Sequence, residues 1–180
     1  MIFFLAVTSY KAYSQKNDST NMISVSVDII GKGNRLIQKT YKHPIKYDDF
    51  NSYFTLLKVS SNADTMIHFW TMLCSWEENW LSNNDSVLLY HPACDVNIPI
   101  EIKLKPHQSV KFYGILRPRS DTLQNNKFKL GFVMLEKSDL DLNFSSRTER
   151  YELMNKKGIY WSNEVELKDN IYRYKVENSQ

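Results

Sequence analysis

The chain contains no run of about 20 apolar residues, the length that a helix needs to cross a bilayer. It also contains no long run of basic residues. Its 23 lysines and arginines and 20 aspartates and glutamates are spread over 180 residues, with a net charge of +3. Without a basic tract to follow a phosphate backbone, we expect no nucleic-acid partner. Internal repeats and low-complexity linkers are absent too, which favours a single domain.

The sequence lacks the motifs of the common enzyme mechanisms. It has no G-x-S-x-G, and neither cysteine has the sequence setting of a papain or caspase nucleophile. Residues 31–34, GKGN, form a lone turn with neither P-loop nor dinucleotide-binding spacing. Glu77 and Glu78 are adjacent, so their carboxylates would point to different faces. We therefore predict no catalytic residues, no cofactor and no enzymatic activity.

Metal-binding patterns are weak. A structural zinc site usually shows two close ligand pairs, and only His91 and Cys94 form such a pair. Cys74, together with Asp95 or His68, would have to complete the site. A calcium site is the other alternative, with oxygen ligands from Asn83, Asn84, Asp85 and Asp95. The spacing of an EF-hand is absent, so we predict no bound metal.

The N-terminal segment resembles an export signal. An apolar run, Ile2 to Val7, is followed by small residues at Ala12 and Ser14, the small-x-small pattern that signal peptidase requires. We predict that residues 1–14 are a signal peptide and that the mature chain is periplasmic, secreted or cell-surface bound. The first charge is Lys11, so the usual positive start is missing and a buried N-terminal strand is the alternative. No cysteine lies near the cleavage point, which argues against a lipoprotein.

Export changes the interpretation of the two cysteines, Cys74 and Cys94. In an oxidising compartment a pair of cysteines in one small domain is more often bonded than free. We therefore predict a Cys74–Cys94 disulfide. Closing a loop of this length would stabilise the fold by roughly 3 kcal/mol in the chain-entropy account.

Hydrophobic residues make up 42% of the chain, and they alternate with polar ones. In residues 23–29 and 98–104, every second residue is isoleucine, valine or leucine. Such a period of two places one face of a strand on a core and the other in water. Pro99 interrupts the second segment, which indicates an edge strand or a bulge. With no long amphipathic helix, the pattern predicts one all-β domain, an antiparallel sandwich over residues 20–177.

One short helical turn is expected near residues 75–82. Ser75 and Glu78 have the spacing of a capping box. Trp76 and Trp80 are four residues apart, so they would share one face of the turn.

The segments TLLKVSSNADTMIHFW, CSWEENW, ACDVNIPIEIKLKPHQSV and KFKLGF, within residues 53–135, carry a family resemblance. In order they give strands, a cysteine, a tryptophan turn, a second cysteine, an alternating strand and a K-P turn. The chain resembles small, largely uncharacterised exported immunoglobulin-like β-sandwich proteins of Bacteroidota type. The resemblance implies export and an immunoglobulin-like sandwich, which we expect to have about seven to nine strands. It implies no activity and no catalytic residues.

The tryptophans are the candidate binding residues. Trp70 lies inside a predicted strand and is assigned to the core, whereas Trp76 and Trp80 lie in a polar segment. If these two are exposed, they could anchor a protein partner, with a rim formed by Glu77, Glu78 and Asn79. We therefore predict a non-enzymatic interaction module whose partner is a protein or a cell-surface component. A carbohydrate-binding module with exposed tryptophans and an enzyme-inhibitor-like domain are the alternatives.

Overall fold

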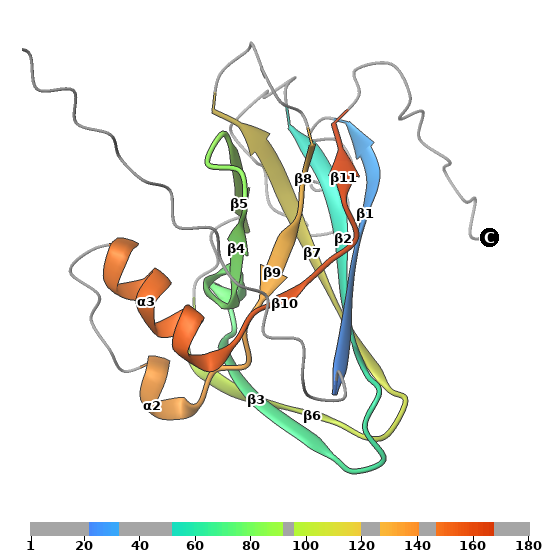
Figure 1. The fold of residues 1–180 in the computed structure, drawn as a ribbon, viewed down its shortest axis with the longest axis vertical. Coiled ribbons are helices and arrows are strands. Elements are labelled where there is room, and N and C mark those ends of the chain that lie inside the picture. Colours follow the sequence, from blue (N-terminus) through green and yellow to red (C-terminus); the bar gives the residue numbers. More distant parts are fainter. Residues whose placement is uncertain (1–21, 33–51, 92–95, 120–126, 141–146, 168–180) are drawn as a thin grey trace, which may run out of the picture.

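The computed structural model describes residues 22–32, 52–91, 96–119, 127–140 and 147–167. One layer of the fold is a four-stranded antiparallel sheet with the order β1-β2-β7-β5. Its strands are β1 (Ile23–Lys32), β2 (Tyr53–Ser61), β7 (Ser109–Pro118) and β5 (Val87–Tyr90). Figure 1 shows the three longer strands side by side, with short β5 beyond β7.

The facing layer consists of short strands. β4 (Trp80–Ser82), β9 (Leu130–Phe132) and β10 (Tyr160–Trp161) pair in the order β10-β9-β4. β8 (Lys127–Phe128) pairs with β11 (Val165–Glu166) and extends this layer. In chain order, β1-β2-β7-β5 facing β10-β9-β4 corresponds to the A-B-E-D and G-F-C sheets of immunoglobulin-like sandwiches. The predicted all-β antiparallel sandwich is therefore confirmed.

The described residues form eleven strands, more than the expected seven to nine, because two long strands are interrupted. Lys129 separates β8 from β9, and its backbone pairs instead with Asn83. The backbone N–H of Lys129 donates to Asn83 Oδ1 at 2.7 Å, and the N–H of Asn83 donates to the Lys129 carbonyl at 3.1 Å. Residues 162–164 likewise separate β10 from β11. The N–H of Ser162 donates to the Leu130 carbonyl at 2.9 Å, and its Oγ accepts from the Leu130 N–H at 3.1 Å.

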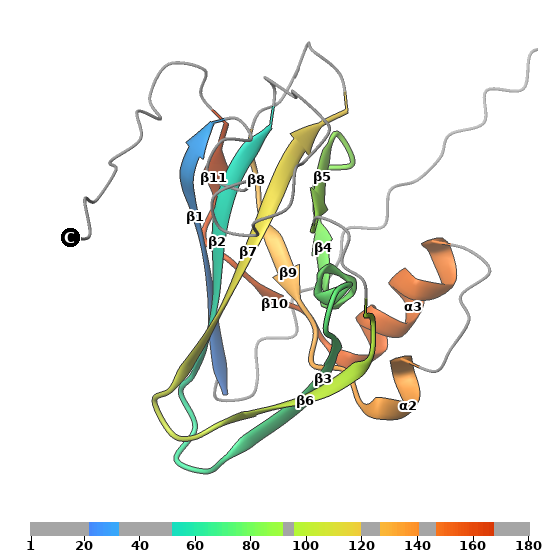
Figure 2. The ribbon, with the colours of Figure 1, turned by 180° about the vertical axis from the view of Figure 1, so that it is seen from behind.

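A two-stranded ribbon closes the base of the sandwich. It pairs β3 (Ile67–Met72) with β6 (Pro99–Leu104), and it runs across the ends of the long strands (Figures 1 and 2). β6 has β3 as its one strand partner among the residues that the structure describes. The edge position that Pro99 predicted is therefore confirmed.

Helices flank the second layer. They are the 3₁₀ turn η1 (Trp76–Asn79), α2 (Lys137–Leu140) and α3 (Arg147–Lys157). The 11-residue α3 was not expected, because its sequence is mostly charged and shows little apolar periodicity. Met154, which is 2% exposed, anchors it against Leu81, Val133 and Leu135. Lys157 Nζ joins α3 to Asp139 Oδ2 of α2 at 2.9 Å, and this hydrogen bond raises the pKa of Lys157.

The core between the layers is aromatic. Trp80, at the start of β4, packs against Phe132 of β9 with ring centroids 5.0 Å apart, and Phe132 in turn meets Phe69 edge-on at 5.1 Å. In immunoglobulin domains a buried tryptophan at this place packs against an inter-sheet disulfide. Here the buried Trp80 packs against the ring of Phe132 instead. Trp161 is paired with Gly131 of β9 and packs over it. Residue 131 has no room for a side chain, because a Cβ atom there would lie 2.4 Å from Ile159 Cγ2 and 3.0 Å from the Trp161 ring.

Candidate binding site

The two tryptophans proposed as anchors are buried, so the exposure on which the proposed binding role of Trp76 and Trp80 depended is not found. Each is 5% exposed. Trp76 packs on Phe112 at 5.1 Å between ring centroids and meets the His91 ring at 5.6 Å. Both indoles belong to the main core, because η1 folds inward over the sheet. The coplanar exposed tryptophans that a carbohydrate platform would need are therefore not formed by this pair.

Asn79 is structural rather than part of a rim. Its side chain is 1% exposed, and Nδ2 donates to the carbonyls of Trp70 at 2.9 Å and Val133 at 3.1 Å. The Asn79 carbonyl accepts from the Val133 N–H at 2.9 Å. This one residue thus connects η1 to β3 and to the segment that follows β9. Its predicted place in an exposed rim is corrected.

The predicted capping box does not form. Ser75 makes no side-chain hydrogen bond to the turn, and its Oγ accepts instead from Asn97 Nδ2 at 2.9 Å. The turn is closed by the backbone, where the Glu78 N–H donates to the Ser75 carbonyl at 3.0 Å. A single 3₁₀ turn is too short to present the first-turn amides of an α-helix to a cap.

Glu77 and Glu78 are partly exposed; Glu78 lines a small cavity beside α3, whereas Glu77 contacts α3 through its backbone carbonyl. Burial raises the pKa of Glu77 to about 7, with a smaller contribution from the charge of Glu78. Arg150 of α3 opposes this shift, and its Nη2 donates to the Glu77 carbonyl at 3.4 Å. The cavity between Glu78, Arg150 and Asp139 has a volume of about 20 Å³, room for about one water molecule. It is too small for a substrate.

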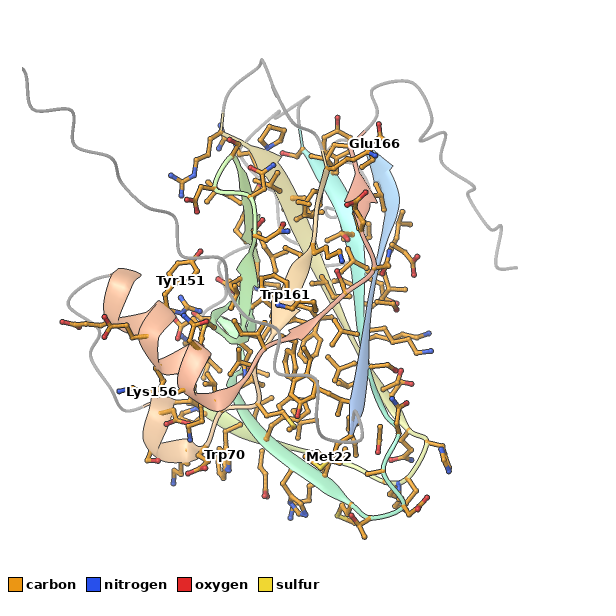
Figure 3. All side chains as sticks on the ribbon, viewed as in Figure 1. Met22, Trp70, Tyr151, Lys156, Trp161 and Glu166 are labelled. Carbon is orange, nitrogen blue, oxygen red and sulfur yellow. The ribbon has the colours of Figure 1, made fainter. Side chains whose placement is uncertain are left out.

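Trp70, assigned to the core from sequence, is half-buried on the outer face of β3. Lys137 Nζ of α2 lies 5.4 Å from the centre of its ring, at the base of the molecule (Figure 3). Trp161 lies in β10, with Tyr151 of α3 to its side (Figure 3). Trp70 thus connects α2 to the ribbon, while Tyr151 and Trp161 pack against the apolar cluster that anchors α3.

An exposed apolar surface does lie next to η1, on residues that the sequence had not indicated as a binding surface. We call it the apolar tip: Leu73, Val96 and Ile98, which are 45%, 55% and 50% exposed. Leu73 directly follows β3 and Ile98 directly precedes β6, and the Leu73 N–H donates to the Ile98 carbonyl at 2.9 Å. Val96 lies two residues before Ile98 in the chain, and its carbonyl oxygen lies 2.6 Å from Sγ of Cys74, the residue after Leu73.

Asn97 fixes the backbone of the apolar tip. Its Oδ1 accepts from the N–H groups of Cys74 at 3.1 Å and Ser75 at 3.2 Å, while its Nδ2 donates to Ser75 Oγ. The tip is therefore held by side-chain bonds as well as by the strand ladder.

The alternation in residues 98–104 predicted that all four apolar residues face the core. Leu104 is 4% exposed, Ile102 and Ile100 are half-buried, and Ile98 is 50% exposed. All four lie on one side of the strand, so the period of two is right. The ribbon extends beyond the sandwich, however, and the core ends before the strand does. Sequence alternation reports the face but not where the core ends.

The remaining predicted ligands are separated or lie outside the described residues. His68 Nδ1 lies 3.0 Å from Glu101 Oε1, and His91 packs on Trp76. Cys94 and Asp95 lie outside the described part of the chain, so both metal alternatives remain untested at those positions. Among the residues that are described, no group of three or more histidines, cysteines or carboxylates is placed to hold a metal ion.

The fold and the tip together define an immunoglobulin-like sandwich with an exposed apolar end. No protein-family description matches the chain, and no curated protein matches it. Among solved structures it is similar to a FixG-related protein from Vibrio parahaemolyticus, with 13% identity and a TM-score of 0.33. The match covers 67% of this chain and 87% of the other. Within the described residues, no helix is long and apolar enough to cross a membrane.

Proposed function

We propose that the protein is an exported, non-enzymatic binding module that engages another protein through the apolar tip. The observation that carries this proposal is the exposure of Leu73, Val96 and Ile98, three aliphatic side chains gathered at one end of the ribbon. Contiguous apolar surface with a polar rim is typical of protein-interaction sites. Ser75 and Asn97 supply polar groups beside it.

The rigidity of the tip supports the same role. Association loses affinity when backbone and side chains must be ordered on binding. Here the three bonds made by Asn97 and the ladder between β3 and β6 hold the tip before a partner arrives. The aliphatic side chains would then enter an apolar pocket of the partner with little rearrangement.

Export and the disulfide are part of the proposal. The sulfur of Cys74 lies 2.6 Å from the carbonyl oxygen of Val96, which follows Cys94 by two residues in the sequence. A disulfide needs Cα atoms about 4.4–6.8 Å apart, a separation comparable to the reach of two residues of chain. The contact thus supports a Cys74–Cys94 bond that would fasten the tip to η1. The mass of the exported protein, with and without reduction and alkylation, tests cleavage after Ser14 and the bond together.

Binding is tested by affinity purification from the envelope fraction of cells that make the protein. The full chain is compared with a Leu73→Ser, Ile98→Ser double variant and with Leu88→Ser, a control at an exposed leucine of β5. We expect one protein to be enriched with the wild type and the control and lost with the tip variant. Equal recovery with all three, or no enriched protein, would refute the apolar tip as the binding surface.

A further inference from the structure

The outer edge of β6 has backbone groups that the described part of the fold leaves open. The Leu73 N–H bonds to the Ile98 carbonyl, so Ile98 and every second residue after it direct their backbone groups toward β3. Pro99, Glu101 and Lys103 consequently direct theirs away from β3. The Trp70 N–H, opposite Glu101, points away from β6 to the Leu135 carbonyl at 2.8 Å, as this alternation requires.

The outer edge of β1, unlike that of β6, is covered by a side chain. β1 has β2 as its one strand partner within the described ranges, and the side chain of Asn163 covers the other edge. Asn163 Oδ1 accepts from the Val27 N–H at 2.9 Å, and its Nδ2 donates to the Val27 carbonyl at 3.1 Å. Such a plug stops another strand from pairing there. No comparable side-chain plug is seen at Glu101 or Lys103 among the described contacts.

We propose that β6 pairs antiparallel with β6 of a second copy of this chain, across a twofold axis at Ile102. This register places Glu101 opposite Lys103 of the second copy, and the symmetry repeats the pair. Both residues direct their N–H and carbonyl groups to the open edge, so each pair can exchange two backbone hydrogen bonds. The side chains of Glu101 and Lys103 share one face, where opposite charges across strands attract.

In this register the pairing ends where β6 has no further free backbone N–H groups on its outer edge. It places Pro99, which has no N–H, opposite Lys105 of the second copy. The N–H of Lys105 already donates to Gln108 Oε1 at 3.1 Å, and its carbonyl accepts from the Gln108 N–H at 3.1 Å. The pairing is therefore limited to a short segment around Ile102 and cannot propagate into a longer sheet.

Burial and charge favour a second copy over an unrelated strand. Ile100 and Ile102 are half-buried at the rim of the core, and a paired β6 would place Ile102 opposite Ile102 and Ile100 opposite Leu104 of the other copy. Within one chain, Lys103 Nζ lies 3.0 Å from Glu101 Oε2, so the assembled edge would contain balanced charges. A partner strand with one sign of charge would lack this balance. The apolar tip is not required for the pairing.

Sedimentation equilibrium of the full chain at increasing concentrations tests the proposal, with charge-reversal variants. Wild type is expected to dimerise reversibly. Glu101→Lys and Lys103→Glu each place like charges opposite one another and should weaken the dimer at least about tenfold. The double variant, E101K with K103E, restores opposite charges and should restore the dimer. Lys111→Glu, at an exposed position of β7, is the control with the same change of charge as Lys103→Glu.

Three results would overturn the pairing: a monomer at every concentration, a dimer that the single reversals leave unchanged, or a double variant that stays monomeric. Circular dichroism checks that each variant folds, which we expect because these ion pairs are solvent-exposed and exposed ion pairs add little stability. Hydrogen exchange gives a second readout. The amides of Glu101 and Lys103 should gain protection as the concentration rises, while those of Ile100 and Ile102, which face β3, should not change. Since the apolar tip is unaltered in these variants, loss of the dimer can be separated from loss of the proposed binding role.

Discussion

The η1 turn and the apolar tip are neighbours in space, yet apolar side chains are buried at the turn and exposed at the tip. The turn and Trp80, the residue that follows it, lie in a polar stretch of sequence, and Trp76 and Trp80 are each 5% exposed. The tip lies just beyond the ends of β3 and β6, and its residues Leu73, Val96 and Ile98 are about half exposed. Burial is decided by whether a segment folds over the sheets or extends past them. The tryptophans therefore support the structure, and the aliphatic residues are left to interact.

Substitution of Trp80, which directly follows the turn, should have the largest effect on stability. Trp80→Ala removes an indole that packs on Phe132 and Phe112 between the two layers. Truncating a buried aromatic side chain typically costs about 3–5 kcal/mol of unfolding free energy. Denaturant-induced unfolding would measure it, with Trp70→Ala, at a half-buried ring, as the milder comparison. A loss below about 1 kcal/mol would contradict the assignment of Trp80 to the core.

Loosening the tip should have an intermediate effect. Asn97→Ala removes the acceptor for the N–H groups of Cys74 and Ser75, and each lost bond costs about 0.5–1.5 kcal/mol. Asn97→Asp keeps the acceptor oxygen and should retain more of the stability, and exposed Asn155→Ala is the control. Thermal unfolding measures all three. If Asn97→Ala and Asn155→Ala behave alike, Asn97 does not fix the tip.

The turn should also respond to pH. Burial raises the pKa of Glu77 to about 7, from an ordinary 4.5 that applies in the unfolded chain. The folded state thus binds the proton more tightly, so this contribution to stability is full below pH 4.5 and is lost as the pH rises through 7. Relative to Glu77→Gln, the wild type should lose stability between these values. Unfolding at several pH values checks this, and a constant difference would contradict it. Glu164→Gln is the control at an exposed carboxyl.

Removing apolar surface from the tip should have the smallest effect on folding. Ile98→Ser replaces a side chain that is 50% exposed, and substitutions away from buried contacts usually change stability by less than about 0.5 kcal/mol. Thermal unfolding of this variant should therefore match the wild type. A large loss would mean that Ile98 supports the fold, and the contrast between turn and tip would fail.

The sequence predicted the fold class and the edge position of β6 because both follow from local properties: a period of two and a proline. It missed α3, whose good helix formers, such as Glu152, Leu153 and Lys156, show no clear apolar stripe. It also assigned the wrong role to Trp76 and Trp80, since the polarity of neighbouring residues does not tell which way a turn folds. The apolar tip was out of reach because alternation gives the face of a strand, whereas exposure depends on where the opposing layer ends.

Site-specific photo-crosslinking in cells that make the protein tests the central claim most directly. A photoreactive residue would be placed at position 98 in the apolar tip and, separately, at position 88 on β5. The account predicts a discrete adduct with another protein from position 98 and none from position 88. Identical products from both positions, or no adduct from position 98, would show that the apolar tip is not the surface on which a partner binds.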